Sequence, residues 1–246
     1  MEQSTLRQIQ EDLRRQLVVC VGQGGHGKSS LIRNLVEQTQ DIRFKVFDNS
    51  FVWYHESPML YRLRVKPDTA WTTPNVNNCV YEIGELTEAE SRAFIAKIIQ
   101  EDYMSRYYGV LFDGTGVIGE IPPIVYIVEE ANTVFNSTSL NKDDEPGSTL
   151  RKWVSVGRNF GLRGILVTTA AYGELATKIR RRAALLLGQV LGNDELGAIG
   201  RRAGKGVKKT VTELNRFNWV YWNGHEFPVF RSSPYSGEAP LDYSPP

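Results

Sequence analysis

The sequence contains the stretch Gly22-Gln23-Gly24-Gly25-His26-Gly27-Lys28-Ser29, which is a complete G-x-x-x-x-G-K-[ST] phosphate-binding loop. An apolar run from Leu17 to Val21 precedes it, and a helix-like segment from Ser30 to Val36 follows it. Glycines let backbone N–H groups wrap a phosphate, and the amino end of a helix attracts negative charge. We therefore expect residues 22–30 to bind a nucleoside triphosphate.

Two side chains at the end of this loop have different expected roles. Lys28 would reach the β- and γ-phosphates, and the Ser29 hydroxyl would ligate Mg²⁺. His26 lies between the glycines, where many residue types are tolerated, so we assign it to the loop and not to catalysis. The alternative is a glycine-rich turn before a helix, which would need neither Lys28 nor Ser29.

Composition sets broad limits on the chain. Its 246 residues fit one large α/β domain or two small ones, and 41% hydrophobic with 23% charged residues is typical of a soluble globular protein. A net charge of +1 means that any contact with DNA must come from local basic patches. Cys20 and Cys79 are expected as buried thiols, and no apolar run is long enough to span a membrane. We expect a cytoplasmic or virion-associated protein.

Alternating strand and helix patterns predict an α/β fold, with a mostly parallel sheet covered by helices on both faces. A capping box at Thr87 and Glu90 is expected to start one long helix. Near the end, Asn223-Gly224 predicts a β-hairpin. The expected strands are 17–21, 44–48, 80–83, 124–128, 164–168, 219–222 and 227–230; the expected helices are 4–16, 28–38, 86–103 and 149–159, and 136–149 is expected to be a loop.

Two adjacent acids follow the most apolar of these strands. The run Ile124–Val128 leads directly into Glu129 and Glu130, so both carboxylates are expected at the edge of the sheet where the phosphates bind. In this interpretation Glu129 supports the Mg²⁺ shell and Glu130 polarises the attacking water as a general base. The alternative is a strand that merely ends in solvated acids.

A GTPase interpretation rests on two short motifs. Asp113-Gly114-Thr115-Gly116 matches D-x-x-G, and Asn141-Lys142-Asp143-Asp144 matches the guanine-reading N-K-x-D. The segment before Asn141 is mostly polar and the two motifs lie close together, which argues against this interpretation. The apolar run Val110–Phe112 before Asp113 favours it.

Three segments together resemble the FtsK–HerA superfamily of ring-forming, DNA-pumping ATPases. They are GQGGHGKSSLI from Gly22, IVYIVEEAN from Ile124 and VGRNFGLRGILVTT from Val156. The resemblance spans about residues 15–231 and is greatest to the small genome-packaging ATPases of membrane-containing icosahedral viruses. It implies a RecA-like P-loop fold in which Lys28 and Ser29 belong to the Walker A motif, and Glu129 and Glu130 to the Walker B motif.

The resemblance also implies ATP and Mg²⁺ as ligands, a homohexameric ring with ATP at subunit boundaries, and double-stranded DNA in a central channel. Arg158 matches the arginine that this family donates across the boundary to the γ-phosphate; Arg14 and Arg15 are further candidates, and a helix-capping role for Arg158 is the alternative. Where the family usually ends the next strand with a γ-phosphate-sensing Gln, this chain has Thr168-Thr169, so Thr169 is the candidate sensor.

Basic residues cluster late in the chain and could bind DNA phosphates without reading bases. The alternative is a solvated face, or cations that pair with acids of a neighbouring subunit. Glycines in the second cluster predict a loop there. The residues are Lys178, Arg180, Arg181, Arg182, Arg201, Arg202, Lys205, Lys208 and Lys209.

These observations favour an ATP-driven translocase of double-stranded DNA, with a motor domain at 1–231 and a proline-rich tail at 232–246 that would be frayed or would tether a capsid-vertex or membrane-vertex protein. The alternatives are a nucleotide-switch assembly protein and the GTPase considered above.

Overall fold

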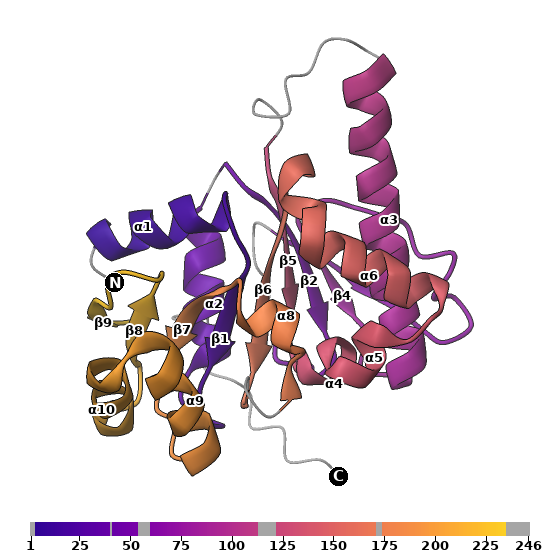
Figure 1. Cartoon of the computed structure of the whole chain (residues 1–246). Coiled ribbons are helices and arrows are strands. Elements are labelled where there is room, and N and C mark those ends of the chain that lie inside the picture. The colour runs from indigo at the N-terminus through magenta and orange to yellow at the C-terminus, as the bar shows by residue number, and fades with distance from the viewer. Residues whose placement is uncertain (1–2, 40, 54–59, 113–121, 171–173, 235–246) are drawn as a thin grey trace.

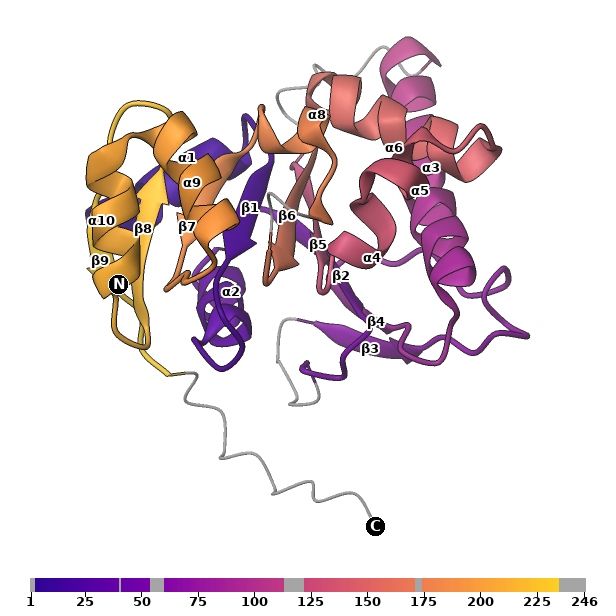
Figure 2. The same ribbon diagram turned by 60° about the horizontal axis from the view of Figure 1, so that its bottom comes forward.

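The computed structural model of the chain describes residues 3–39, 41–53, 60–112, 122–170 and 174–234. In this part, nine strands form one sheet in the order β3-β4-β2-β5-β6-β1-β7-β8-β9. Figure 2 shows β3 and β4 at one end of the sheet and β8 and β9 at the other. The strands are β1 (Val18–Val21), β2 (Arg43–Asp48), β3 (Tyr61–Arg64), β4 (Cys79–Glu82), β5 (Ile124–Val128), β6 (Leu162–Thr168), β7 (Ala184–Leu187), β8 (Asn218–Trp222) and β9 (Val229–Arg231).

The first seven strands in this order are parallel, and β8 and β9 pair antiparallel at one end. Strand β6 lies between β1 and β5, with Val21 opposite Thr168 and Val128 opposite Leu166. The carboxyl ends of β1, β6 and β5 therefore lie at one edge of the sheet, which is where parallel α/β sheets bind ligands.

Each central strand is buried on both faces, which explains its continuous apolar sequence. On one face, helices α1 (Gln3–Leu13) and α2 (Lys28–Glu37) pack against Val18, Cys20 and their neighbours. A larger group of helices lies on the other face (Figure 1). Their apolar side chains pack against Val19, Val21 and their neighbours. These helices are α3 (Glu88–Phe112), α4 (Asn132–Phe135), α5 (Ser137–Asn141), α6 (Glu145–Val156), α8 (Thr177–Arg180), α9 (Asn193–Ala203) and α10 (Lys205–Glu213).

The predicted α/β fold is confirmed, including the capping box that starts α3. The Thr87 amide donates to the Glu90 carboxylate at 2.8 Å, and the Glu90 amide donates to the Thr87 hydroxyl at 3.3 Å. The predicted hairpin also forms, with Val220 opposite Val229. Its connection is held by the Asn223 side chain, which accepts the amides of His225 and Glu226.

Two segments predicted as loops are instead helical. Residues 136–149 contain α5 and the start of α6, because Asn136 and Asp144 cap these helices through side-chain oxygens that accept from Ser139 and Gly147. Pro146 lies in the first turn of α6, where its missing N–H costs no helical hydrogen bond.

The second basic cluster forms the helices α9 and α10 and not the predicted loop. Apolar side chains from both helices, including Ile199 and Val207, are buried against the sheet. Gly204 ends α9 with a φ of 96°, and Gly200 lets the Lys208 stem approach closely. Glycines here separate and pack two helices; they do not unwind the segment.

Both cysteines are buried free thiols, as predicted, and burial raises the pKa of each to about 12. None of the helices in the described ranges combines the length and apolar character needed to cross a membrane.

Candidate nucleotide site

The phosphate-binding loop connects β1 to α2, as the sequence predicts. Gly25 and Gly27 have φ values of 74° and 98°, in the left-handed region that favours glycine. A Cβ at Gly27 would also lie 2.6 Å from the ring of Phe217. Helix α2 therefore begins directly behind a loop whose backbone conformation requires glycine.

The Lys28 side chain folds back onto its own loop. Its Nζ donates to the carbonyl oxygens of Gly22 at 2.8 Å and Gln23 at 3.1 Å. Ser29 and Ser30 follow in the first turn of α2 and are partly exposed. A triphosphate is the kind of ligand that would draw the Lys28 ammonium away from these carbonyls, because charged acceptors form the stronger hydrogen bonds.

His26 anchors the loop to the end of the sheet. Its ring is 5% exposed, with Nε2 2.9 Å from the Asn218 carbonyl oxygen and 3.2 Å from the Gln189 amide nitrogen. The ring also packs edge-on against Trp219, with centroids 4.9 Å apart, and burial lowers the His26 pKa. The side chain thus ties the loop to β8, and sequence reasoning did not anticipate this contact.

Glu129 lies at the same edge of the sheet as the phosphate-binding loop. It follows β5 directly, is 4% exposed, and its amide donates to the Phe47 carbonyl at 3.1 Å. Strands β1 and β5 run parallel on either side of β6, so Lys28, in the loop after β1, and Glu129, directly after β5, follow strand ends at the same edge of the sheet. The structure therefore brings together the lysine and the first of the two predicted acids.

The Glu129 carboxyl lies in an environment that opposes its ionisation. Burial, as the largest effect, raises its pKa from 4.5 to about 7. The hydrogen bond from the Trp53 indole and the charges of Lys28 and Arg33 act in the opposite direction, while Asp48 adds to the rise. A cation placed beside Glu129 would favour the carboxylate form.

Glu130 occupies an unusual backbone conformation. Its φ is 49°, although it is not a glycine, and its carbonyl accepts from the Thr133 amide at 3.0 Å and the Thr133 hydroxyl at 2.9 Å. Such conformations cost on the order of 1–3 kcal/mol and cluster at functional sites. The turn at Glu130 directs the chain away from the strand immediately after the buried Glu129, and the Glu130 residue is partly exposed.

Thr169 lies at the carboxyl end of the strand between the loop and the acids. It is exposed and lines a cavity of about 480 Å³ together with Gln23 and Gly24. Thr168, by contrast, is buried, and its hydroxyl accepts from the Ala170 amide at 3.2 Å. Of the two threonines, Thr169 is the one that borders the phosphate-binding loop.

The donors at this edge fit Mg²⁺ bound together with a nucleotide. Mg²⁺ usually takes one or two carboxylates plus substrate phosphates and waters, not a full cage of protein ligands. Ser29 and Glu129 supply a hydroxyl and a carboxylate, and the described part of the chain contains no group of three His, Cys, Asp or Glu side chains suited to hold a metal by themselves.

Arg158 lies at the opposite edge of the sheet. It belongs to the 3₁₀ turn η2 (Gly157–Phe160), just before the amino end of β6. Seven residues of β6 separate this turn from Thr169, which is about 20 Å of extended chain. Arg158 therefore cannot reach a phosphate bound at Lys28 of the same chain.

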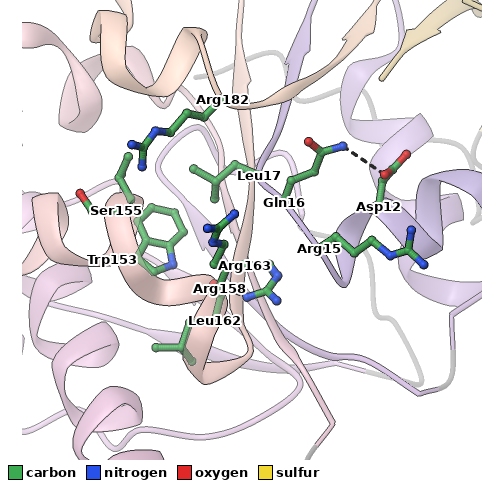
Figure 3. Close-up of a pocket in the computed structure, with 11 residues that line it drawn as sticks. Asp12, Arg15, Gln16, Leu17, Trp153, Ser155, Arg158, Leu162, Arg163 and Arg182 are labelled. Carbon is green, nitrogen blue, oxygen red and sulfur yellow. Dashed lines mark hydrogen bonds between the residues drawn. The ribbon is translucent and has the colours of Figure 1, made fainter. Parts of the chain in front are cut away.

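Several arginines share a cavity of about 640 Å³ at this edge (Figure 3). Arg163 is 7% exposed and is held by the Arg14 carbonyl, to which its Nε and one terminal nitrogen donate at 2.9 and 2.6 Å. Burial and the charges of Arg106 and Arg158 lower its pKa to about 10. The other arginines that line the cavity, all exposed, are Arg15, Arg158 and Arg182.

The buried Trp153 also lines this cavity, and its indole nitrogen has no hydrogen-bond partner among the described residues. A concave surface with exposed guanidinium groups and a buried N–H is suited to an anion. Arg14, one of the further candidates, points to Asp41 instead, with which it forms an ion pair.

Sequence reasoning missed two residues at the nucleotide edge, Asp48 and Trp53. Asp48 ends β2 and is fully buried, and Trp53 donates its indole N–H to Glu129 at 2.9 Å. An acid at the end of a predicted apolar strand was a usable signal for Asp48. The 76-residue separation of Trp53 and Glu129 leaves no such signal for their contact.

The structure argues against the guanine-reading motif. Asp144 caps α6 and binds Arg92 through both carboxylate oxygens, at 2.8 and 2.5 Å, which holds its pKa well below its usual range. Val110–Phe112 lies in helix α3 and does not form the strand that a D-x-x-G motif follows; Asp113–Gly116 lies outside the described residues. No strand leads into Asn141, which ends α5.

Comparison with known proteins gives matches among solved structures alone. No protein-family model matches the chain, and neither does any curated protein. The genome packaging NTPase B204 from Sulfolobus turreted icosahedral virus 2, in complex with AMPPCP, is 18% identical with a TM-score of 0.60, and the match covers 90% of this chain and 98% of that one.

Two further structures are similar over most of the chain. The pCW3 conjugation coupling protein TcpA is 13% identical with a TM-score of 0.58, over 91% of this chain and 62% of that one. VirB4 of Thermoanaerobacter pseudethanolicus is 13% identical with a TM-score of 0.55, over 89% and 90%. The chain thus has the fold of a viral genome-packaging NTPase, as the sequence resemblance predicted.

Proposed function

We propose that this protein is a Mg²⁺-dependent ATPase that translocates double-stranded DNA, and that it packages a viral genome. The observation that carries the proposal is that Lys28 and Glu129 follow parallel strands ending at one edge of the sheet, while the Arg158 cavity lies at the opposite edge. Nucleotide-bound structures of a packaging NTPase with the same fold support it.

At the nucleotide edge, the loop amides and the α2 amino end would hold the phosphates, and Lys28 would exchange its two carbonyl partners for phosphate oxygens. Ser29 and Glu129 would hold Mg²⁺, which neutralises charge on the phosphates when bound. Glu130, at the turn beyond Glu129, would accept the proton of the attacking water. Thr169 would contact the γ-phosphate or this water through its hydroxyl.

The arginine cavity would complete the site of a neighbouring subunit. Because Arg158 is about 20 Å of β-strand away from its own phosphate-binding loop, it can act only on a nucleotide bound by another chain. A closed homohexameric ring satisfies this requirement at every boundary, because its interfaces are heterologous and repeat identically.

DNA contact is assigned to exposed cations on α8 and α9. Arg180, Arg181, Arg201 and Arg202 line a cavity of about 520 Å³. Arg202 is partly turned inward, donating to the Ala183 carbonyl and lying 4.8 Å from the Trp222 ring centre. Arg181 and Arg201 are the exposed pair, so they are the better candidates to contact phosphates.

The test is ATP hydrolysis by the full chain with and without duplex DNA, together with light scattering in the presence of ATPγS. We expect an assembled ring and hydrolysis that DNA stimulates. If hydrolysis is unaffected by DNA but depends on a protein partner, the protein is instead a nucleotide-switch assembly protein. Preferential competition by GTP over ATP would overturn the ATPase assignment.

A further inference from the structure

The Trp53 side chain touches the acid that we assign to Mg²⁺. Its Nε1–H donates to Glu129 Oε1 at 2.9 Å, and the two residues are only 3% and 4% exposed. A buried carboxylate with one oxygen engaged in this way loses rotational freedom. Its second oxygen is then the one available to face a ligand.

The loop that carries Trp53 is fixed in place by Asp48. The Asp48 carboxylate accepts the backbone amides of Ser50 and Val52, each at 3.2 Å, and that of Trp53 at 2.8 Å. Strand β2 pairs directly with β5, and Glu129 continues that pairing through its bond to the Phe47 carbonyl. Asp48 and Glu129 therefore sit side by side, and the loop returns the indole to the acid.

Trp53 also contacts the helix that carries the phosphate-binding residues. The Arg33 guanidinium, from α2, lies 5.2 Å from the centre of the Trp53 ring system. Lys28 and Ser29 begin the same helix. The indole is thus packed between the helix that would hold the phosphates and the carboxylate that would face the metal.

Trp153 shows that simple core filling does not require such a contact. It is as buried as Trp53, at 3% exposure, yet its indole nitrogen has no partner among the described residues. Buried indole N–H groups nevertheless usually find a partner, as Trp219 does with the Ser232 hydroxyl at 3.0 Å. What distinguishes Trp53 is its acceptor, which is the buried Glu129 carboxylate at the carboxyl edge of the sheet.

We propose that Trp53 is a positioning residue that orients the Glu129 carboxylate toward Mg²⁺, so that its indole N–H sets the Mg²⁺ requirement of the nucleotide site. This inference rests on the proposed function, because it takes Glu129 as the carboxylate that supports the metal. Partners of this kind behind a metal ligand commonly change metal affinity by about 10-fold to 100-fold when they are removed.

The test compares the free Mg²⁺ needed for half-maximal hydrolysis in the wild type, Trp53→Phe and Trp71→Phe. Phenylalanine keeps an aromatic ring but removes the N–H, and Trp71 is 58% exposed, so it serves as the matched control. We expect Trp53→Phe to raise the Mg²⁺ midpoint by about 10-fold, with nucleotide affinity in EDTA unchanged. An unchanged midpoint in a folded Trp53→Phe protein would overturn the proposal.

A second measurement uses chains that retain Trp53, so it does not depend on the folding of that variant. Indole N–H resonances of ¹⁵N-tryptophan-labelled protein are compared between the wild type and Glu129→Gln. Recorded above the Glu129 pKa of about 7, the Trp53 resonance should shift upfield in Glu129→Gln, because a neutral amide is a weaker acceptor than a carboxylate, and the Trp71 resonance should stay in place. An unmoved Trp53 resonance would refute the contact.

Failure of this proposal and failure of the proposed function give different results. A protein that hydrolyses no ATP in Mg²⁺ would contradict the ATPase, while the indole shift in Glu129→Gln would still report on the contact. If DNA stimulates hydrolysis but Trp53→Phe does not change the Mg²⁺ midpoint, the proposed function stands and the positioning role of Trp53 is wrong.

Discussion

The two edges of the central sheet carry opposite kinds of chemistry. At the carboxyl edge, Lys28 donates a hydrogen bond to its own loop and Glu129 accepts one from Trp53, so both side chains have partners within the chain. At the amino edge, Arg15, Arg158 and Arg182 are exposed around a cavity. In the proposed function, the carboxyl edge would form the larger part of a nucleotide site, and the amino edge of a second chain would supply the cations that this part lacks.

This difference explains why an assembly would be needed for activity. The length of β6, which runs from just after the Arg158 turn to Thr168, keeps the two edges apart within a chain. Bringing the edges of two chains together unites a triphosphate and an arginine without any conformational change inside either chain. Substitutions at one edge should therefore alter activity without changing the structure of the other edge.

The largest effect is expected from Arg158→Ala. Arginines donated in this way contribute about 10³- to 10⁵-fold to turnover in P-loop enzymes, so hydrolysis by the assembled protein should fall by about 10³-fold or more. Steady-state hydrolysis measures this loss, and Lys178→Ala, an exposed cation outside the cavity, is the control.

Mixing variants tests whether the two edges belong to different chains. Lys28→Ala disables the phosphate-binding loop but keeps Arg158. Arg158→Ala removes the arginine but keeps an intact loop. A mixture should regain activity, because some boundaries would pair an intact loop with an intact arginine. The assignment of the loop and the arginine to different chains is wrong if Arg158→Ala hydrolyses ATP as its control does and the mixture is no more active than the separate variants.

Glu130→Gln should have the next largest effect, confined to the carboxyl edge. Loss of the general base should lower kcat by about 10²- to 10⁴-fold while nucleotide affinity is kept. Hydrolysis and ATPγS binding are measured on the same preparation. Wild-type turnover in this variant would remove Glu130 from the role of base.

The buried carboxyl of Glu129 at the carboxyl edge should also make the stability of the protein depend on pH in the absence of Mg²⁺ and nucleotide. Because burial raises the Glu129 pKa from 4.5 to about 7, the folded protein holds a proton that the unfolded chain releases between these values. The free energy of unfolding should therefore fall as pH rises through this window, by at most about 3 kcal/mol.

Denaturant titrations of the wild type and Glu129→Gln measure this pH dependence. The variant should lose most of the slope between pH 4.5 and 7, since its amide does not ionise. Equal slopes in the two proteins would show that Glu129 ionises normally in the fold.

The smallest effect is expected on DNA binding. Replacing both Arg181 and Arg201 with Glu should weaken duplex binding by about 10-fold or more and reduce the salt slope by about 2. Fluorescence anisotropy at several salt concentrations measures both quantities. Lys205→Glu, on the neighbouring helix α10, is the control; an equal loss there would mean that the contact is spread over the whole basic face.

Local patterns in the sequence were sufficient to predict most of the fold. The β5 strand was predicted at its exact bounds, 124–128, because five apolar residues in succession fit a strand buried on both faces. The α3 start was predicted because Thr87 and Glu90 satisfy each other's amides. In contrast, 136–149 and 201–209 were predicted as loops, since glycine, proline and polar residues can cap and pack short helices as well as break them.

The candidate site divides in the same way. Gly22–Ser29, Glu129 and Glu130 were predicted as site residues from short-range spacing and from the end of one strand, and the structure puts them at one edge of the sheet. Arg158 was identified by resemblance, and its geometry could not be read from the sequence. The roles of Trp53 and the His26 anchor were missed because their partners lie 76 and 192 residues away, whereas Asp48 was missed although its backbone partners are local.

The sequence by itself determined that a triphosphate loop and a pair of acids exist, and that parallel strands carry them. These properties follow from backbone sterics and from apolar runs, which act over a few residues. Only the tertiary structure decided that Arg158 faces away from its own loop and that an indole fixes Glu129. Such relations depend on strand order and on packing between segments 76 or more residues apart, where local sequence carries no distance information.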